Sequence, residues 1–404
     1  MKNHAGYLLH PRYDSTVRGI LLLTCRYLTA NKLKTAILLV CLTATFFLPL
    51  ALKFLIARFE EDLLARGNAT PLVVGVRGDR FDLVLKSLYF NSDSPGAVSA
   101  RELDDLQAEG RGLAIPIHAD FSARDFSVVG TSLEYFDFRG LRAVEGSLPL
   151  RLGDAVLGAN VARALQLGPG DSVLTDQESL YNIAAIYPLK MHVTGVLGER
   201  GTPDDDAIFT DIKTAWIIAG IGHGHTDVSE PGKEALLLDK TDDLVVASAA
   251  VVEYNEITDA NIASFHFHAD RQHLPLTSVI YVPDSPKSAT ILKGRFNVSK
   301  TLQMLEPRVV LEELMGIVFQ VKKFFDGSFL LVFATTALFL VLVVLLSLKL
   351  RERERQALFR IGCSRGVVFC MQATELLALI MVSALLAGAS ALALAEGLST
   401  LVLR

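Results

Sequence analysis

The sequence predicts a membrane protein with three α-helical spans and a large mixed α/β domain outside the cytoplasm. Three apolar runs are each long enough to cross about 30 Å of hydrocarbon. About 270 residues with strand-like segments separate the first run from the second. Hydrophobic residues make up 51% of the chain and the mean hydropathy is +0.38, yet 21% charged residues require a large water-facing part. A net charge of -5 leaves no basic surface for nucleic acid, so we exclude that class of partner.

Residues 1–34 are expected in the cytosol. Within them, residues 17–34 set apolar side chains against Arg18, Arg26, Lys32 and Lys34, which predicts a basic amphipathic helix lying on the lipid surface. The opening residues lack the charged-then-apolar pattern of a cleaved signal peptide. Residues 35–57 are predicted to form the first span, and the basic residues before it keep the N-terminus inside.

Residues 58–327 are therefore expected outside the cytoplasm, as an α/β domain. Its strand-like runs are 72–76, 126–129, 191–197, 244–252 and 278–282, and its helical patterns are 100–109 and 208–219. The segment 154–173 predicts a strand, a helix, a turn and a strand. Residues 92–99 and 199–206 have the composition of turn-rich loops.

Two further spans are predicted, at 328–348 and 367–395, with a short outer C-terminus at 396–404. Between them, residues 349–366 carry six basic residues against two acids, so this linker stays cytosolic and forms a short charged helix and a turn. In the last span a row of small residues allows close contact with another helix of the bundle or of a partner chain. These predicted packing residues are Ser383, Ala387, Gly388, Ala391 and Ala395.

The chain carries none of the common catalytic signatures. There is no G-x-x-x-x-G-K-[ST] phosphate loop, no H-E-x-x-H and no G-x-S-x-G, so we predict no catalytic residue and no ATP binding by this chain. Its four cysteines all fall in the cytosolic or membrane parts. The outer domain therefore has no disulfide framework and relies on packing.

A cluster of histidines lies in the outer domain. Two His-x-His pairs are each followed by an aspartate, and neutral imidazole with carboxylate is a ligand set that suits Zn²⁺. Two interpretations stay open: a zinc site, or ordinary loop histidines, with the second pair alternating with phenylalanines on a half-buried strand. The candidate ligands are His223, His225, Asp227, His266, His268, Asp270 and His273.

The charged linker KLRERERQALFRIGCSR and the helix that follows it, opening with GVVFCMQATELLAL, resemble the MacB/FtsX/LolC group of ABC transporter permeases. The resemblance implies a bacterial inner-membrane permease with a MacB periplasmic core-like domain in two lobes, working by mechanotransmission. It implies a cytosolic ABC ATPase subunit that holds ATP and Mg²⁺, and a second permease copy, most simply as a homodimer. It also assigns the ATPase-coupling residues to Glu352, Glu354, Leu358, Arg360, Ile361, Gly362, Ser364 and Arg365.

A fourth span is usual in that group, and the sequence after residue 395 is too short to form one. More specific stretches, VVGVRGDRFDLVLKSLYF, AIFTDIKTAW and SFHFHAD, resemble a sub-branch encoded beside zinc-responsive periplasmic proteins. That resemblance implies zinc-linked transport or homeostasis, in which the system passes zinc or a zinc-binding protein, and no cofactor other than zinc is expected in this chain. Two other functions stay open: export of lipophilic compounds or lipoproteins, and FtsX-like regulation of a periplasmic partner protein without transport.

Overall fold

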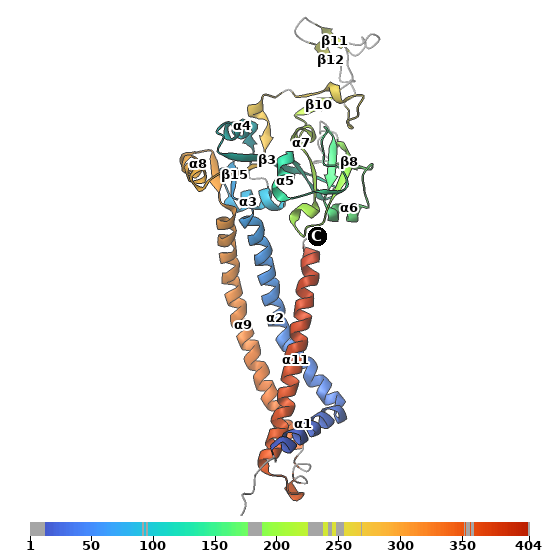
Figure 1. The fold of residues 1–404 in the computed structure, drawn as a ribbon, viewed down its shortest axis with the longest axis vertical. Coiled ribbons are helices and arrows are strands. Elements are labelled where there is room, and N and C mark those ends of the chain that lie inside the picture. Colours follow the sequence, from blue (N-terminus) through green and yellow to red (C-terminus); the bar gives the residue numbers. More distant parts are fainter. Residues whose placement is uncertain are drawn as a thin grey trace, which may run out of the picture. The chain divides into compact units, whose positions relative to one another are not determined.

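The structure is a computed structural model that describes most of the chain, namely residues 13–90, 93, 96–176, 188–224, 237–240, 245–247, 254–267, 269–350, 352, 356 and 359–402. The chain divides into a helical unit, Met1–Glu60 with Ile317–Leu401, and an α/β unit, Glu61–Gly316 with Val402–Arg404. Figure 1 shows the course of the chain through the elements.

The helical unit is built from long apolar helices. They are α1 (Tyr13–Ala30), α2 (Lys32–Asn68), α9 (Pro307–Leu350) and α11 (Arg365–Val402). Two described helical stretches, Lys32–Asn68 and Arg365–Ala395, have the length and the hydropathy to cross a membrane. The third predicted span, 328–348, lies inside α9, and its role as a span stays a prediction.

The helices run past the boundaries expected from the sequence. α2 begins at Lys32 and continues to Asn68, and α9 begins at Pro307, well before residue 328. Proline suits a first helical turn because that turn does not need its N–H. α11 continues past residue 395 to Val402. α2 and α9 are therefore each one continuous helix that ends or begins inside the α/β unit.

The α/β unit is organised around one mixed sheet of ten strands. Its order is β16-β1-β15-β3-β4-β9-β6-β8-β5, with β7 pairing β8. In chain order the strands are β1 (Leu72–Val76), β3 (Gly112–Ala123), β4 (Phe126–Thr131), β5 (Ala143–Gly146), β6 (Asp154–Leu157), β7 (Ser172–Leu174), β8 (Lys190–Leu197), β9 (Ala207–Asp211), β15 (Ser278–Pro283) and β16 (Leu302–Leu305).

Short helices and two-stranded ladders complete the α/β unit. The helices are α3 (Arg80–Tyr89), α4 (Ala100–Ala108), α5 (Leu133–Arg139), α6 (Ala159–Leu165), α7 (Ile212–Ile218) and α8 (Pro286–Val298), with 3₁₀ turns η1 (Pro203–Asp206), η3 (Ile262–Ser264) and η4 (Arg271–His273). The ladders are β2 (Val98–Ser99) with β14 (Pro275–Leu276), β10 (Gly222–Gly224) with β13 (Phe265–Phe267), and β11 (Leu237–Lys240) with β12 (Val245–Ala247).

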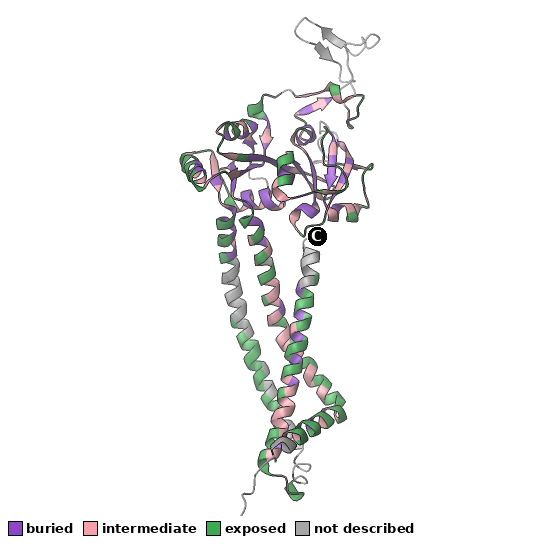
Figure 2. Ribbon diagram, in the orientation of Figure 1, coloured by how far each residue is buried: buried purple, intermediate pink, exposed green. Residues whose placement is uncertain are grey.

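The chain builds this sheet in two parts. β1, β3 and β4 come first, β5 to β9 follow, and β15 and β16 then return to pair with β1. Each part has its own apolar core, one around Leu106, Tyr281 and Leu292 and the other around Leu157 and Ile208. Figure 2 shows the buried residues gathered on the sheet of this unit. The two lobes expected from the resemblance therefore share one sheet.

Most of the predicted segments are confirmed. β1 has the predicted bounds, the runs 126–129, 191–197 and 278–282 lie in β4, β8 and β15, and 154–173 forms β6, α6 and β7. The predicted helix 100–109 is α4. Of the run 244–252, only residues 245–247 are among the described residues, as β12.

The single helix predicted at 208–219 is wrong, because the segment divides into strand β9 and helix α7. The first four residues of β9 are buried in the middle of the sheet, where an apolar run has no periodicity to separate strand from helix. The boundary is Asp211, whose side chain accepts hydrogen bonds from the backbone N–H groups of Lys213 and Thr214 and so caps α7.

Candidate functional site: the anchor of α2 in the α/β unit

The last turns of α2 are buried in the α/β unit. Leu63 and Arg66 are only 6% and 7% exposed. The Tyr89 hydroxyl donates to the Leu63 carbonyl oxygen, and the Thr70 hydroxyl donates to that of Arg66, which holds the C-terminal end of the helix. A helix with the apolar sequence of a span therefore ends as part of the core of a domain.

α2 also meets the start of α9 at close range. A Cβ atom on Gly67 would lie 2.7 Å from Leu311 Cδ1 and 3.4 Å from the backbone of Arg308. Only glycine allows the two helices to approach this closely without a shift of the neighbouring side chain. Leu311 is buried, so the two helices that continue from apolar segments are packed together within this unit.

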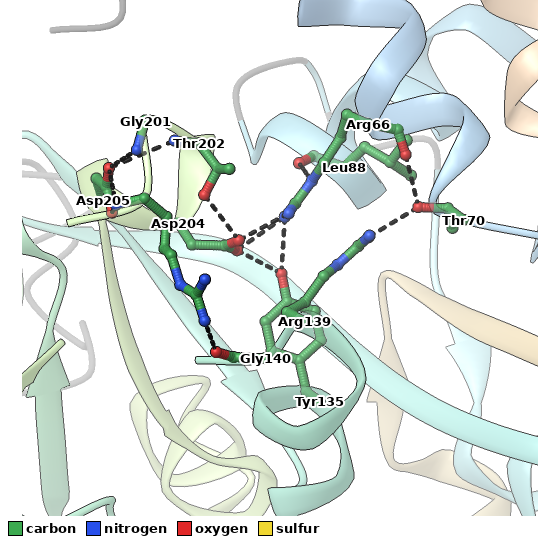
Figure 3. Close-up of polar contacts among 11 residues, drawn as sticks. Arg66, Thr70, Leu88, Tyr135, Arg139, Gly140, Gly201, Thr202, Asp204 and Asp205 are labelled. Atoms are coloured by element: carbon green, nitrogen blue, oxygen red, sulfur yellow. Dashed lines mark hydrogen bonds and ion pairs between the residues drawn. The ribbon is translucent and has the colours of Figure 1, made fainter. Parts of the chain in front are cut away.

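Arg66 is the centre of a buried polar network (Figure 3). Its Nη1 and Nη2 atoms each donate to one carboxylate oxygen of Asp204 at 2.7 Å, Nη2 also donates to Tyr135 Oη at 2.9 Å, and Nε donates to the Leu88 carbonyl oxygen at 3.3 Å. The Tyr135 hydroxyl donates to Asp204 at 2.6 Å. Bidentate geometry and full hydrogen bonding are the conditions under which a buried ion pair is tolerated.

The 3₁₀ turn η1 positions Asp204. Thr202 and Asp205 form a capping box around the turn, and Pro203 occupies its first position. The Asp205 carboxylate accepts hydrogen bonds from the backbone N–H groups of Arg200 and Gly201, while the Thr202 hydroxyl donates to Asp204 itself. The turn-rich loop expected at 199–206 is therefore an ordered turn that presents one carboxylate to α2.

Aromatic side chains pack around Tyr135 of the network. Tyr135 and Phe136, both from α5, lie 5.5 Å and 5.6 Å from the Phe209 ring of β9, and Phe90 lies 5.9 Å from the same ring. All of these rings are at most 2% exposed. Packing of this density leaves the Tyr135 hydroxyl little freedom to move.

The electrostatics keep the network in its charged form. Burial by itself would raise the pKa of Asp204, but the charge of Arg66 and the hydrogen bonds from Arg66 and Tyr135 hold that pKa below its usual value. Burial and the neighbouring Asp204 carboxylate raise the pKa of Tyr135 to about 12. Tyr135 therefore keeps its proton at neutral pH, and its hydroxyl donates a hydrogen bond to Asp204.

This arrangement is a structural connection between three elements. It fixes a helix, α5 and a 3₁₀ turn to one another through groups that are far apart in the sequence. Sequence reasoning missed it. The available signals were an arginine that follows Leu63, Leu64 and Ala65 in a helical pattern, and a Thr-Pro-Asp-Asp-Asp run of the type that caps a helix.

The structure describes part of the predicted coupling segment as a helix end and a turn. Gly362 has a φ of +97° and its N–H donates to the Phe359 carbonyl oxygen, which ends the helical stretch that includes Phe359 and Arg360. The Ser364 hydroxyl accepts from the N–H of Val367 and so begins α11. Glu352, Arg360 and Arg365 are exposed, and Ile361 is 80% exposed. Glu354 and Leu358 lie outside the described residues.

The predicted packing residues of α11 lie on its buried side. Ser383, Ala387 and Ala391 are 0% exposed and Ala395 is 8% exposed, whereas Gly388 is half-buried. The Ser383 hydroxyl donates to the Leu39 carbonyl oxygen of α2 at 3.4 Å. Within the helical unit, this face of α11 therefore contacts α2.

The candidate metal ligands are only partly described. His225, Asp227 and His268 lie outside the described residues, whereas His223, His266, Asp270 and His273 lie within them. Among the described residues, no group of three His, Cys, Asp or Glu side chains is placed to hold a metal ion. The predicted set is therefore not assembled from its described members: His223 and His266 face each other, and Asp270 and His273 are exposed on and beside η4.

Comparison with known proteins identifies the α/β unit. Residues 73–254 match the family described as the MacB-like periplasmic core domain. A comparison with curated proteins found no match. This part of the chain is thus a MacB-like periplasmic core domain. Together with two helices that have the length and hydropathy of membrane spans, this domain indicates a membrane protein with an extracytoplasmic domain.

Solved structures with a similar domain have low identity to this chain. The periplasmic region of MacB from Actinobacillus actinomycetemcomitans is 10% identical with a TM-score of 0.33, and covers 61% of this chain and 95% of its own. The extracellular domain of the noncanonic ABC-type transporter YknZ from Gram-positive bacteria is 12% identical with a TM-score of 0.32, covering 58% and 98%. A permease domain from Porphyromonas gingivalis is 10% identical with a TM-score of 0.27, covering 58% and 86%.

Proposed function

We propose that this chain is the membrane subunit of an ABC transporter of the bacterial inner membrane, and that it passes ATP-driven movement from a separate cytosolic ATPase to its periplasmic domain. The observation that carries this proposal is the buried Arg66–Asp204 pair. α2 is one continuous helix, and its end is fixed in the domain by a bidentate ion pair. A displacement of that helix along its axis is therefore passed to η1 and α5 rather than absorbed by a flexible linker.

The cytosolic side of the proposal depends on the turn between α9 and α11. Ile361 is 80% exposed at this turn, between the exposed residues Arg360 and Gly362. Ile361, beside Gly362, supplies an apolar contact, and the neighbouring arginines supply charge. We assign this turn to the ATPase, with a second copy of the chain completing a symmetric assembly.

The test is co-purification followed by hydrogen exchange. The tagged full chain is purified from its native membranes, and an accompanying protein with a nucleotide-binding phosphate loop is identified by mass spectrometry. We expect Ile361→Asp to lose this ATPase and the matched control Val298→Asp, a change at an equally exposed apolar residue of the α/β unit, to retain it. Absence of any ATPase from the wild-type preparation would overturn the permease role.

The transmission step is tested in the same complex. With ATP and Mg²⁺, amide exchange in α5 and η1 should differ from that with ADP, and Arg66→Gln should abolish the difference while keeping the ATPase bound. Arg80→Ala is the control, because Arg80 of α3 forms an exposed ion pair with Glu313 of α9. An unchanged difference in Arg66→Gln would show that Arg66 does not transmit movement.

Two other functions predict different results in this complex. An exporter of lipophilic compounds or lipoproteins would show ATPase stimulation by its cargo, whereas an FtsX-like regulator would bind a periplasmic partner protein with no cargo moved. The predicted zinc context depends on a different part of the chain, the histidines of β10 and β13. The coupling role holds with or without zinc.

A further inference from the structure

β10 and β13 form a small antiparallel ladder with an alternating pattern. Gly222, His223 and Gly224 lie opposite Phe267, His266 and Phe265, in that order. A Cβ on either glycine would come within 2.6 Å of the facing phenyl ring. Phenylalanines thus cover one face of the ladder and require glycine across from them. Because side chains alternate along a strand, both histidines lie on the other face.

The spacing of the two histidines matches that of two ligands on one metal ion. Their ring centroids lie 5.1 Å apart with 67° between the ring planes. A tetrahedral Zn²⁺ holds each imidazole nitrogen at about 2.0–2.1 Å, which places the centres of two bound rings about 5 Å apart. The ladder therefore holds both rings at the separation that one metal ion needs.

A backbone hydrogen bond sets the tautomer of His266. Its Nδ1 lies 2.8 Å from the Ser264 carbonyl oxygen, and a carbonyl oxygen can only accept. Nδ1 therefore carries the proton, and the lone pair of the neutral ring lies on Nε2. Metal-binding histidines in proteins are commonly oriented in this way, by donation from their other nitrogen to a carbonyl oxygen.

The two phenylalanines of the ladder pack against other aromatic side chains. Phe267 lies 6.2 Å from the buried ring of Trp216, and Phe265 lies 6.5 Å from Tyr254. The Trp216 indole N–H donates to the Pro275 carbonyl oxygen at 2.7 Å, which fixes that ring. His223 and His266 are half-buried on the opposite face. Because this packing holds the strands that carry the two histidines, their side chains lose little conformational entropy when they bind a metal ion.

We propose that His223 and His266 bind one divalent transition-metal ion of the Zn²⁺ class through their ring nitrogens. The described residues supply two ligands, so water or donor atoms of a delivered ligand take the other positions. The site is independent of the proposed coupling role.

The test is metal titration of the full chain in lipid nanodiscs at pH 7.5. Zn²⁺ binding is followed by calorimetry and Co²⁺ binding by the visible absorption of the tetrahedral ion. We expect His223→Ala and His266→Ala each to weaken binding at least about tenfold, since each removes a ligand. His273→Ala is the matched control, an exposed histidine of η4 outside the pair, and should bind as the wild type does.

Two further measurements serve as controls for the titration: Trp216 emission and the pH dependence of binding. Trp216 is the only tryptophan and contacts Phe267, so unchanged Trp216 emission shows that a variant keeps the ladder folded. Binding should also be lost at pH 5.5, where protons compete for imidazole. No binding by the wild type, or equal loss in His273→Ala, would overturn the assignment. Ile361→Asp should bind metal normally, which separates failure of this site from failure of the coupling role.

Discussion

The Arg66 guanidinium of α2 and the Asp204 carboxylate of η1 form two parallel hydrogen bonds of 2.7 Å, with the side chains only 7% and 1% exposed. The two residues are 138 positions apart in the sequence. Removing one partner of such a pair leaves the other buried without compensation, whereas replacing both with apolar groups of similar size leaves neither charge unpaired. Replacing both residues should therefore cost less stability than replacing only one of them.

We expect Arg66→Met or Asp204→Leu alone to destabilise the α/β unit by about 3–5 kcal/mol. For a domain of this size that corresponds to a fall in Tm of about 6–20 °C. The double variant should recover most of the loss. Thermal unfolding of the full chain, followed by the emission of Trp216, measures all three. The control Arg80→Ala, at an exposed pair, should cost less than about 1 kcal/mol. A double variant as unstable as the sum of the singles would contradict this account.

Acid should destabilise the α/β unit through His118. Burial lowers the pKa of this histidine; Asp120 opposes that shift and Lys86 adds to it. Unfolded histidine has a pKa of about 6.5, so below that pH the unfolded chain takes up a proton that the folded chain binds less well. Stability therefore falls as the pH drops through this window.

His118→Gln should reduce the difference in Tm between pH 7.5 and pH 5.5, measured by the same emission. His192→Gln is the comparison, because His192 lies half-exposed on β8. If both variants keep the pH dependence of the wild type, His118 is not its source.

Glycine at position 222 should be required, although the ladder it belongs to is short. A Cβ there would lie 2.6 Å from Phe267 and 3.2 Å from Ile217. We expect Gly222→Ala to cost about 1–3 kcal/mol through overpacking. Gly294→Ala, in α8 with no atom within 4 Å of the added Cβ, should instead raise stability by roughly 0.5–1 kcal/mol, since alanine favours a helix. The opposite signs of the two changes are the check.

A larger side chain on the buried face of α11 should separate it from α2. Ala387 is 0% exposed and Ala384, on the same helix, is exposed. We expect Ala387→Leu to destabilise the helical unit by about 1–3 kcal/mol and Ala384→Leu to have little effect. Loss of helical circular dichroism on titration of the full chain with SDS measures both. Equal midpoints in the two variants would mean that this face does not pack.

The sequence by itself determined the elements of this protein. Apolar runs, period-two strands such as 191–197 and a Gly-Ser helix boundary at Gly362 and Ser364 are set by neighbours within a few residues, so local patterns predict them. Local patterns failed at 208–219, because a buried strand and a helix share one apolar run there. The helix boundary at Asp211 depends on where the sheet ends.

The tertiary structure alone decided which distant residues meet. That Arg66 pairs with Asp204, and that His223 lies opposite His266, depends on sheet order and on strand register. Register is specified by packing across the strands, here phenylalanine over glycine, and not by the composition of either strand. Local sequence patterns cannot contain this information because the energies that select it come from contacts between segments far apart in the chain.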